Sequence, residues 1–219
     1  VAACLVLCIA IPLGVYAGAY PKRASSKLIM SGSILGISLP SFWVGMMMIY
    51  IFAVVLRLLP ASGRGNTVMV GNVALSIFAP GGIRYVILPA ITLALTNVAT
   101  MLRLTRSGIL ENMRQDYIKF ARAKGVPAKS ILFGHALKNA LIPVVTIFGM
   151  DLGNMIAFTT ITETIFAWPG MGKLLIDAIN KSDRPIIVAY LMAAACMFVV
   201  LNFIVDILYT LIDPRIELR

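Results

Sequence analysis

Residues 186–212 read IIVAYLMAAACMFVVLNFIVDILYTLI and contain a single charged residue, Asp206. About 20 apolar residues are what an α-helix needs to cross the ~30 Å hydrocarbon core of a bilayer. The whole chain shares this character, because 60% of its 219 residues are hydrophobic, whereas about 45–50% is usual in a soluble domain. The sequence therefore predicts an all-α, multi-pass membrane protein.

Four further apolar stretches precede this one, and we predict about five spans in all. They cover residues 1–19, 28–59, 85–103 (or up to 107) and 141–162. At ~1.5 Å per residue, residues 28–59 are too long for one straight helix across a bilayer. Pro40 is expected to kink this span, because proline removes a backbone hydrogen bond.

The chain begins with Val1, inside an apolar stretch. A signal peptide has basic residues before its apolar core, whereas here Lys22 and Arg23 follow it. We therefore interpret residues 1–19 as a spanning helix, and we expect that the true N-terminus of the protein is missing from the sequence.

Basic residues are unequally distributed among the connections. The first (21–27) carries three lysines and arginines and the third (103–138) carries eight, whereas the second (61–84) and the fourth (163–185) carry two and three. The positive-inside rule places the first and third connections in the cytoplasm. Residues 213–219 are then also predicted to be cytoplasmic.

The formal net charge of +10 is explained by these basic residues in the predicted cytoplasmic connections. We therefore expect no nucleic-acid partner. Cys4, Cys8 and Cys196 lie in apolar spans without metal-ligand or disulfide spacing. The sequence has no phosphate-binding glycine loop and no catalytic constellation. We therefore expect no metal, no cofactor and no catalytic residue.

Residues 109–140 are too many for a simple turn between spans. We expect a helix over 109–123, a helix end at Gly125 and a second helix over 130–139 that follows Pro127. The apolar residues expected on one face of the first helix are Ile109, Met113, Tyr117 and Phe120. Composition leaves two interpretations open, a basic amphipathic helix on anionic lipid or a docking element for a soluble partner.

Two strings in this loop resemble the cytoplasmic coupling loop of bacterial ABC importer permeases, most closely those of the dipeptide/oligopeptide/nickel branch. They are ARAKG at 121–125 and HALKNALIP at 135–143. Further strings in the same order agree: SLPSFWVG at 38–45, LPASG at 59–63, ETIFAWPGMG at 163–172 and DPRI at 213–216. The resemblance thus covers nearly the whole chain.

The chain also departs from the family's patterns. The general loop pattern is Glu-Ala-Ala, three residues, Gly, and the aligned residues here are Lys119, Phe120, Ala121 and Gly125. Only Ala121 and Gly125 match it. In addition, Asp183-Arg184-Pro185 stands where many members have Asp-Tyr-Pro.

The resemblance implies a type I ABC importer permease fold in the bacterial inner membrane, with the family's first span preceding Val1. It implies a second, usually non-identical permease subunit, two cytoplasmic ATPase subunits and an extracytoplasmic solute-binding protein. The solute would be a peptide or a nickel complex, and this chain would be no enzyme. The implied ATPase-coupling helix consists of Ile118, Lys119, Phe120, Ala121, Arg122, Ala123, Lys124 and Gly125.

Two polar residues within the fourth span are candidates for the transport pathway. Asp151 lies between Gly149 and Gly153, and Asn154 follows. A charge at membrane depth normally faces protein or water, so we predict that Asp151 and Asn154 line the pathway or pack between helices. The two glycines, four residues apart, permit close contact between helices.

Two other classes of membrane protein would leave different signatures in the sequence. One is a membrane enzyme or a regulatory anchor whose basic loop binds lipid, and such an enzyme would need paired catalytic residues that converge from several spans. The other is a proton- or sodium-coupled carrier, which would show inverted repeats. The sequence shows neither signature.

Overall fold

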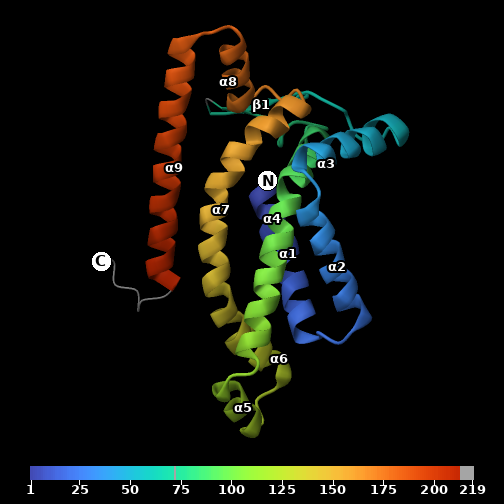
Figure 1. Cartoon of the computed structure of the whole chain (residues 1–219), viewed down its shortest axis with the longest axis vertical. Coiled ribbons are helices and arrows are strands. Elements are labelled where there is room, and N and C mark those ends of the chain that lie inside the picture. The colour runs from blue at the N-terminus through green and yellow to red at the C-terminus, as the bar shows by residue number, and fades with distance from the viewer. Residues whose placement is uncertain (72, 213–219) are drawn as a thin grey trace. The chain divides into compact units, whose positions relative to one another are not determined.

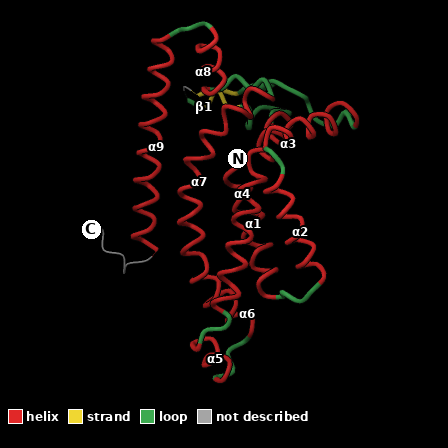
Figure 2. Tube along the Cα trace, viewed as in Figure 1, coloured by secondary structure: helices red, strands yellow, loops and turns green. Residues whose placement is uncertain are grey.

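The computed structural model describes residues 1–71 and 73–212, and nearly all of its ordered elements are helices (Figures 1 and 2). In chain order these helices are α1 (Ala2–Ala19), α2 (Ala24–Ser38), α3 (Ser41–Met48), the π-helix η1 (Ile49–Val55), α4 (Ile83–Asn112), α5 (Asp116–Ala123), α6 (Ala128–Ser130), the π-helix η2 (Ile131–Ala136), α7 (Leu137–Ile165), α8 (Met171–Asn180) and α9 (Arg184–Ile212). The all-α prediction is confirmed. Predictions that concern residues 213–219 lie outside the described residues.

A small hairpin is the exception to the helical fold. Strands β1 (Val68–Val70) and β2 (Val73–Leu75) pair antiparallel, with Val68 opposite Leu75. We did not predict it, because three residues are too few to show the alternation of a strand.

Within residues 1–71 and 73–212, four helices are long and apolar enough to cross a membrane, and a fifth span results if α2 and the helix formed by α3 and η1 count as one. The predicted number of about five spans agrees with this. The chain kinks at Pro40 as expected, and the helical segments before and after the break form an angle of 105°. Pro40 is itself extended, with ψ at 134°, and a residue before proline is also driven out of the helical region.

Contacts between residues divide the described chain into two compact units. Unit 1 contains residues 1–3, 39–95 and 153–200, and unit 2 contains 4–38, 96–152 and 201–212. The long helices α4, α7 and α9 therefore each contribute residues to both units.

Within unit 2, α1 and α4 pack through glycines. A Cβ on Gly14 would lie 2.6 Å from the Cβ of Thr105, and one on Gly18 would lie 2.7 Å from the Cβ of Ile109. Real Cβ atoms do not approach so closely, so these helices meet where α1 has no side chain. This is the small-residue contact typical of membrane helices.

Glycines also bring α7 against α9. A Cβ on Gly149 would collide with Val205 in unit 2, and one on Gly153 would collide with Phe198 in unit 1. The close contact predicted from this glycine pair is confirmed. Elsewhere α9 exposes large apolar side chains, as a lipid-facing helix does; examples are Leu191, Met192, Val199 and Phe203.

Candidate functional site

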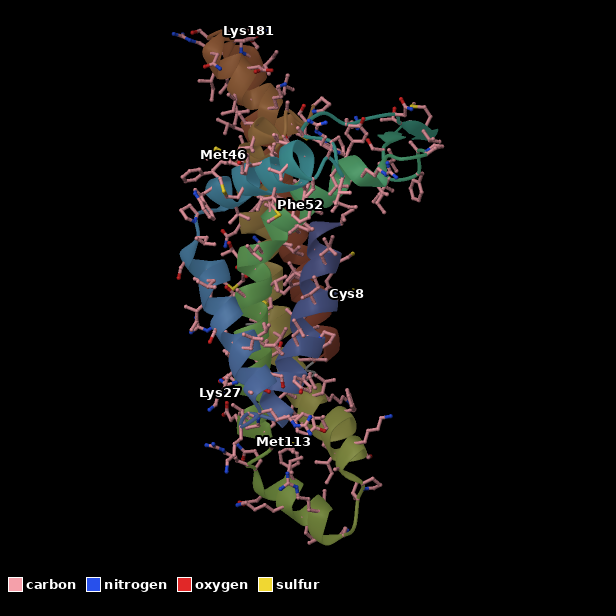
Figure 3. The ribbon with its side chains drawn as sticks, turned by 90° about the vertical axis from the view of Figure 1, so that its right-hand side faces the viewer. Cys8, Lys27, Met46, Phe52, Met113 and Lys181 are labelled. Carbon is pink, nitrogen blue, oxygen red and sulfur yellow. The ribbon has the colours of Figure 1, made fainter. Side chains whose placement is uncertain are left out.

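The connection that follows α4 contains a break that we did not predict. α4 ends at Asn112, residues 113–115 form a turn, and α5 begins at Asp116. The predicted single helix over 109–123 is therefore wrong. Gln115 is extended, with ψ at 153°, and the Asn112 side chain donates a hydrogen bond to the Gly108 carbonyl at 2.8 Å. Asparagine competes in this way with continued helix; Met113 marks the turn in Figure 3.

The turn gives α5 a buried face and an exposed face. Ile118 is completely buried, and Ala121 is partly buried beside it. Phe120 on the other face is 61% exposed and Tyr117 is 41% exposed. The predicted apolar stripe is thus wrong, because Ile109 belongs to α4, Met113 to the turn, and Tyr117 and Phe120 to α5. The buried residues that surround Ile118 are Val15, Ile109, Ile131, Ala136 and Ala140.

Tyr117 ties α5 to two long helices. Its hydroxyl donates a hydrogen bond to Oδ1 of Asn112 at 2.8 Å and accepts one from Nδ2 of Asn139 at 3.0 Å. Asn112 is the last residue of α4, and Asn139 lies in the first turn of α7. These two hydrogen bonds link α5 to both helices.

Gly125 ends α5, as predicted. Its φ is +78°, its N–H donates to the Arg122 carbonyl at 3.0 Å, and the N–H of Val126 donates to the Ala121 carbonyl at 3.1 Å. This pair of bonds is a Schellman turn, which requires a left-handed residue. The next helix starts at Ala128, directly after Pro127, so the chain reverses within a few residues.

Basic side chains frame the exposed face of α5. Lys124 places its Nζ 4.6 Å from the centre of the Phe120 ring, which is within cation–π range. Asp116 in the first turn accepts a hydrogen bond from Lys119 at 2.7 Å, and this bond lowers the pKa of the Asp116 carboxyl below its usual value. Arg122 is exposed as well. The face therefore offers an aromatic ring among positive charges.

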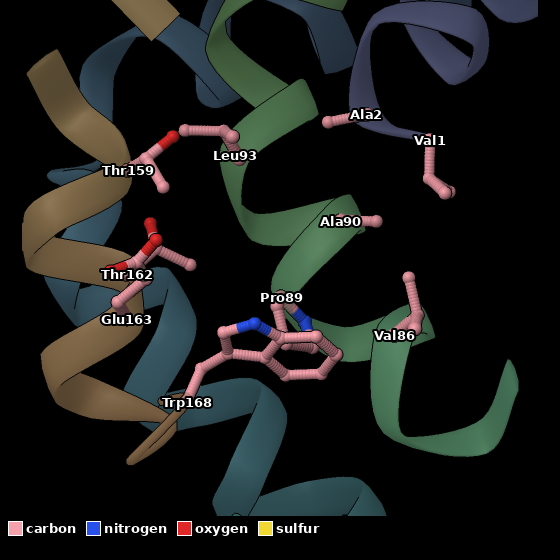
Figure 4. Close-up of a pocket in the computed structure, with 10 residues that line it drawn as sticks. All are labelled: Val1, Ala2, Val86, Pro89, Ala90, Leu93, Thr159, Thr162, Glu163 and Trp168. Atoms are coloured by element: carbon pink, nitrogen blue, oxygen red, sulfur yellow. The ribbon is translucent and has the colours of Figure 1, made fainter. Parts of the chain in front are cut away.

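A second feature is a cavity of about 240 Å³ within unit 1 (Figure 4). Thr162 and Glu163 project toward it from α7, and Val86 and Pro89 lie on α4 opposite, with the Trp168 indole between the two helices. The full lining is Val1, Ala2, Val86, Pro89, Ala90, Leu93, Thr159, Thr162, Glu163 and Trp168. The lining is mostly apolar, with one carboxylate and the hydroxyls of two threonines.

The Glu163 carboxylate also caps α8. Its Oε2 accepts the backbone N–H of Lys173 at 2.9 Å, one of the N–H groups that the first turn of a helix leaves unpaired. A Cβ at Gly170 would collide with this carboxylate. The role of Glu163 was missed, because it depends on the chain folding back across the turn.

Asp151 and Asn154 do not line this cavity. Asp151 is half-buried and Asn154 is exposed. At 3.6 residues per turn, Asp151 lies roughly on the opposite side of α7 from Gly149 and Gly153, and so faces away from α9. Its role in a pathway stays a prediction.

The family described as binding-protein-dependent transport system inner membrane component matches residues 10–218. This chain belongs to that family. The family assignment agrees with the resemblance drawn from the coupling-loop strings, and it establishes a multi-pass protein of the inner membrane.

Relatives of this family member are named as peptide permeases. The di/tripeptide transport system permease protein DppB of Pseudomonas aeruginosa is 42% identical over 86% of this chain and 60% of its own length. The oligopeptide permease AppB of Bacillus subtilis is 41% identical over 97% and 66%. The dipeptide permease DppB of Escherichia coli K12 is 36% identical over 95% and 66%. The chain thus spans roughly two thirds or less of the length of these three relatives.

We expect Glu163→Ala to destabilise the N-terminal end of α8. Loss of a helix cap costs about 0.5–2 kcal/mol, so the midpoint of thermal unfolding should fall and protease cleavage near residues 167–172 should accelerate. Glu163→Gln keeps an acceptor and should have a smaller effect. Glu111→Ala, at an exposed carboxylate, is the matched control. Equal unfolding midpoints for Glu163→Ala and Glu111→Ala would contradict the capping role.

Proposed function

We propose that this chain is the permease subunit of an ATP-driven importer for peptides or a related small polar solute. Family membership and the names of its peptide-permease relatives support this. The observation that carries the proposal is α5, a short helix that exposes Phe120 and basic side chains and is bound through Tyr117 to α4 and α7.

In this proposal residues 109–140 form the coupling loop within a permease domain over residues 1–219. Ile118 and Ala121 anchor the loop to the protein's own core. The ATPase contacts are made by Lys119, Phe120, Arg122, Ala123 and Lys124, while Gly125 allows the sharp exit. Closure of the ATPases on ATP would push α5, and Tyr117 would pass the movement to the spans as a rigid-body shift.

The remaining partners follow from the same proposal. A second permease subunit completes the pathway, two ATPase subunits hydrolyse ATP, and an extracytoplasmic solute-binding protein delivers the solute. The first and third connections and the C-terminus lie in the cytoplasm, as the distribution of basic residues favours. Asp151 and Asn154 remain candidates for pathway or helix-packing residues.

The test is uptake of a labelled dipeptide into proteoliposomes that contain the full-length subunit with its partner subunits and binding protein. We expect uptake that requires ATP and stops with a non-hydrolysable ATP analogue. Uptake driven by a proton or sodium gradient without ATP would contradict the proposal. Binding of the loop to anionic vesicles without any ATPase association would favour the lipid-binding interpretation instead.

A further inference from the structure

Arginines gather in unit 1 in a part of the chain that has no acids. No aspartate or glutamate precedes Glu111 in the sequence, whereas Arg57, Arg64 and Arg84 lie between η1 and the first turn of α4. Arg64 donates a hydrogen bond to Ser76 at 3.2 Å. Among residues 1–71 and 73–212, no carboxylate forms an ion pair with Arg57 or Arg84.

Arg57 and Arg84 line one cavity of about 510 Å³. This volume falls in the range of small-molecule sites, roughly 300–1,000 Å³. Asn66 and Tyr85 add an amide and a phenol to the lining. Gly65 packs directly on the Tyr85 ring with no room for a Cβ, and this contact joins two segments of the cavity wall.

Arg57 occupies a backbone position that favours glycine. Its φ is +53°, and it follows η1 at the point where the Phe52 carbonyl accepts the N–H groups of Leu58 and Leu59 at 2.9 and 3.2 Å. Left-handed residues after a helix end are usually glycine, since a Cβ is unfavourable there. Non-glycine residues in an unfavourable backbone conformation are concentrated at functional sites. The conformation of Arg57 beside a polar cavity therefore suggests that its side chain has a function.

We infer that this cavity binds a carboxylate, namely the C-terminal carboxylate of a peptide solute. Guanidinium groups pair with carboxylates through two parallel hydrogen bonds, and the cavity wall supplies two guanidiniums and no acid. The choice of a peptide as the ligand rests on the proposed function; the preference for a carboxylate rests on the arginines alone.

The test measures direct binding of dialanine and of dialanine amide to the full-length subunit in nanodiscs, without ATP, by titration calorimetry. We expect dialanine to bind at least about tenfold more tightly than the amide, because the amide lacks the charged acceptor. Arg57→Gly keeps the left-handed backbone and removes the guanidinium, and Arg84→Gln neutralises the second one. Each should reduce dialanine affinity about tenfold and remove the preference over the amide.

Arg103→Gln is the matched control, since Arg103 is exposed on the same helix as Arg84 and lies outside the cavity. Its affinity for dialanine should equal that of the wild type. The inference would be overturned if dialanine and its amide bound equally tightly, or if the arginine variants bound dialanine as the wild type does. Either result would leave the proposed function intact, because ATP-driven uptake tests that function separately. Arginine variants that weaken only the association with the solute-binding protein would overturn the inference too. Absence of ATP-driven uptake would instead refute the proposed function.

Discussion

Phe120→Ala is expected to weaken the complex between the subunit and its ATPase about 30-fold. Phe120 is 61% exposed on α5 with the Lys124 ammonium beside its ring. Exposed aromatic residues that become buried at the centre of an interface contribute most of its binding energy, and truncation of one typically costs about 2 kcal/mol or more. The measurement is the dissociation constant between the ATPase and the full-length subunit in nanodiscs.

The matched control for this experiment is Phe78→Ala. Phe78 is 64% exposed and belongs to the second connection, on the side opposite to α5 in the proposed topology. Its removal should leave the dissociation constant unchanged. If both variants bind the ATPase as the wild type does, or if both weaken it equally, α5 is not the docking surface. Substitution of Ala121 is a poorer test, because Ala121 packs against the core of unit 2.

Gly14→Ala is expected to destabilise the protein by about 1–3 kcal/mol, the usual cost of overpacking. The new Cβ would lie 2.8 Å from the backbone carbonyl oxygen of Leu102, as well as against Thr105. A backbone atom cannot rotate aside, so α1 and α4 would have to separate. Thermal unfolding of the purified subunit, followed by size-exclusion chromatography with fluorescence detection, measures the loss.

Gly32→Ala, also within a helix, is expected to stabilise the protein instead. Gly32 is exposed within α2, and a Cβ there would meet nothing within 4 Å. Replacing a helical glycine by alanine then stabilises by roughly 0.5–1 kcal/mol. A Gly14→Ala variant that unfolds at the same temperature as Gly32→Ala would show that the contact between α1 and α4 is not close in the membrane.

Apolar length predicted the spanning helices well. Residues 1–19 and 186–212 match α1 and α9 within two residues at each end, because the bilayer sets the length of an apolar run. Hydropathy did not show where α4 ends, since this helix continues through Arg103 and Arg106 to Asn112. A helix ends where its backbone hydrogen bonds from residue i to residue i−4 stop. Charged side chains do not interrupt these hydrogen bonds, so hydropathy does not mark the helix end.

In the connection over residues 109–140, the sequence predicted helix ends correctly only at residues with one strong conformational preference. Gly125 and Pro127 fixed the end of α5 and the start of the next helix. The turn at 113–115 was missed because it depends on Asn112 and Gln115, and neither residue by itself excludes a continuing helix. The cavity around Glu163 and the one around Arg57 were missed for another reason: their walls come from segments that are distant in sequence.

The most direct test of the account replaces Phe120 by the photoreactive residue benzoylphenylalanine in the full-length subunit, with position 78 as the control. Illumination of intact membranes should then join position 120 to the ATPase subunit, and position 78 should give no such product. This result would place the exposed face of α5 against the ATPase in the assembled transporter. Cross-linking of position 120 to lipid alone, or of position 78 to the ATPase, would contradict the account.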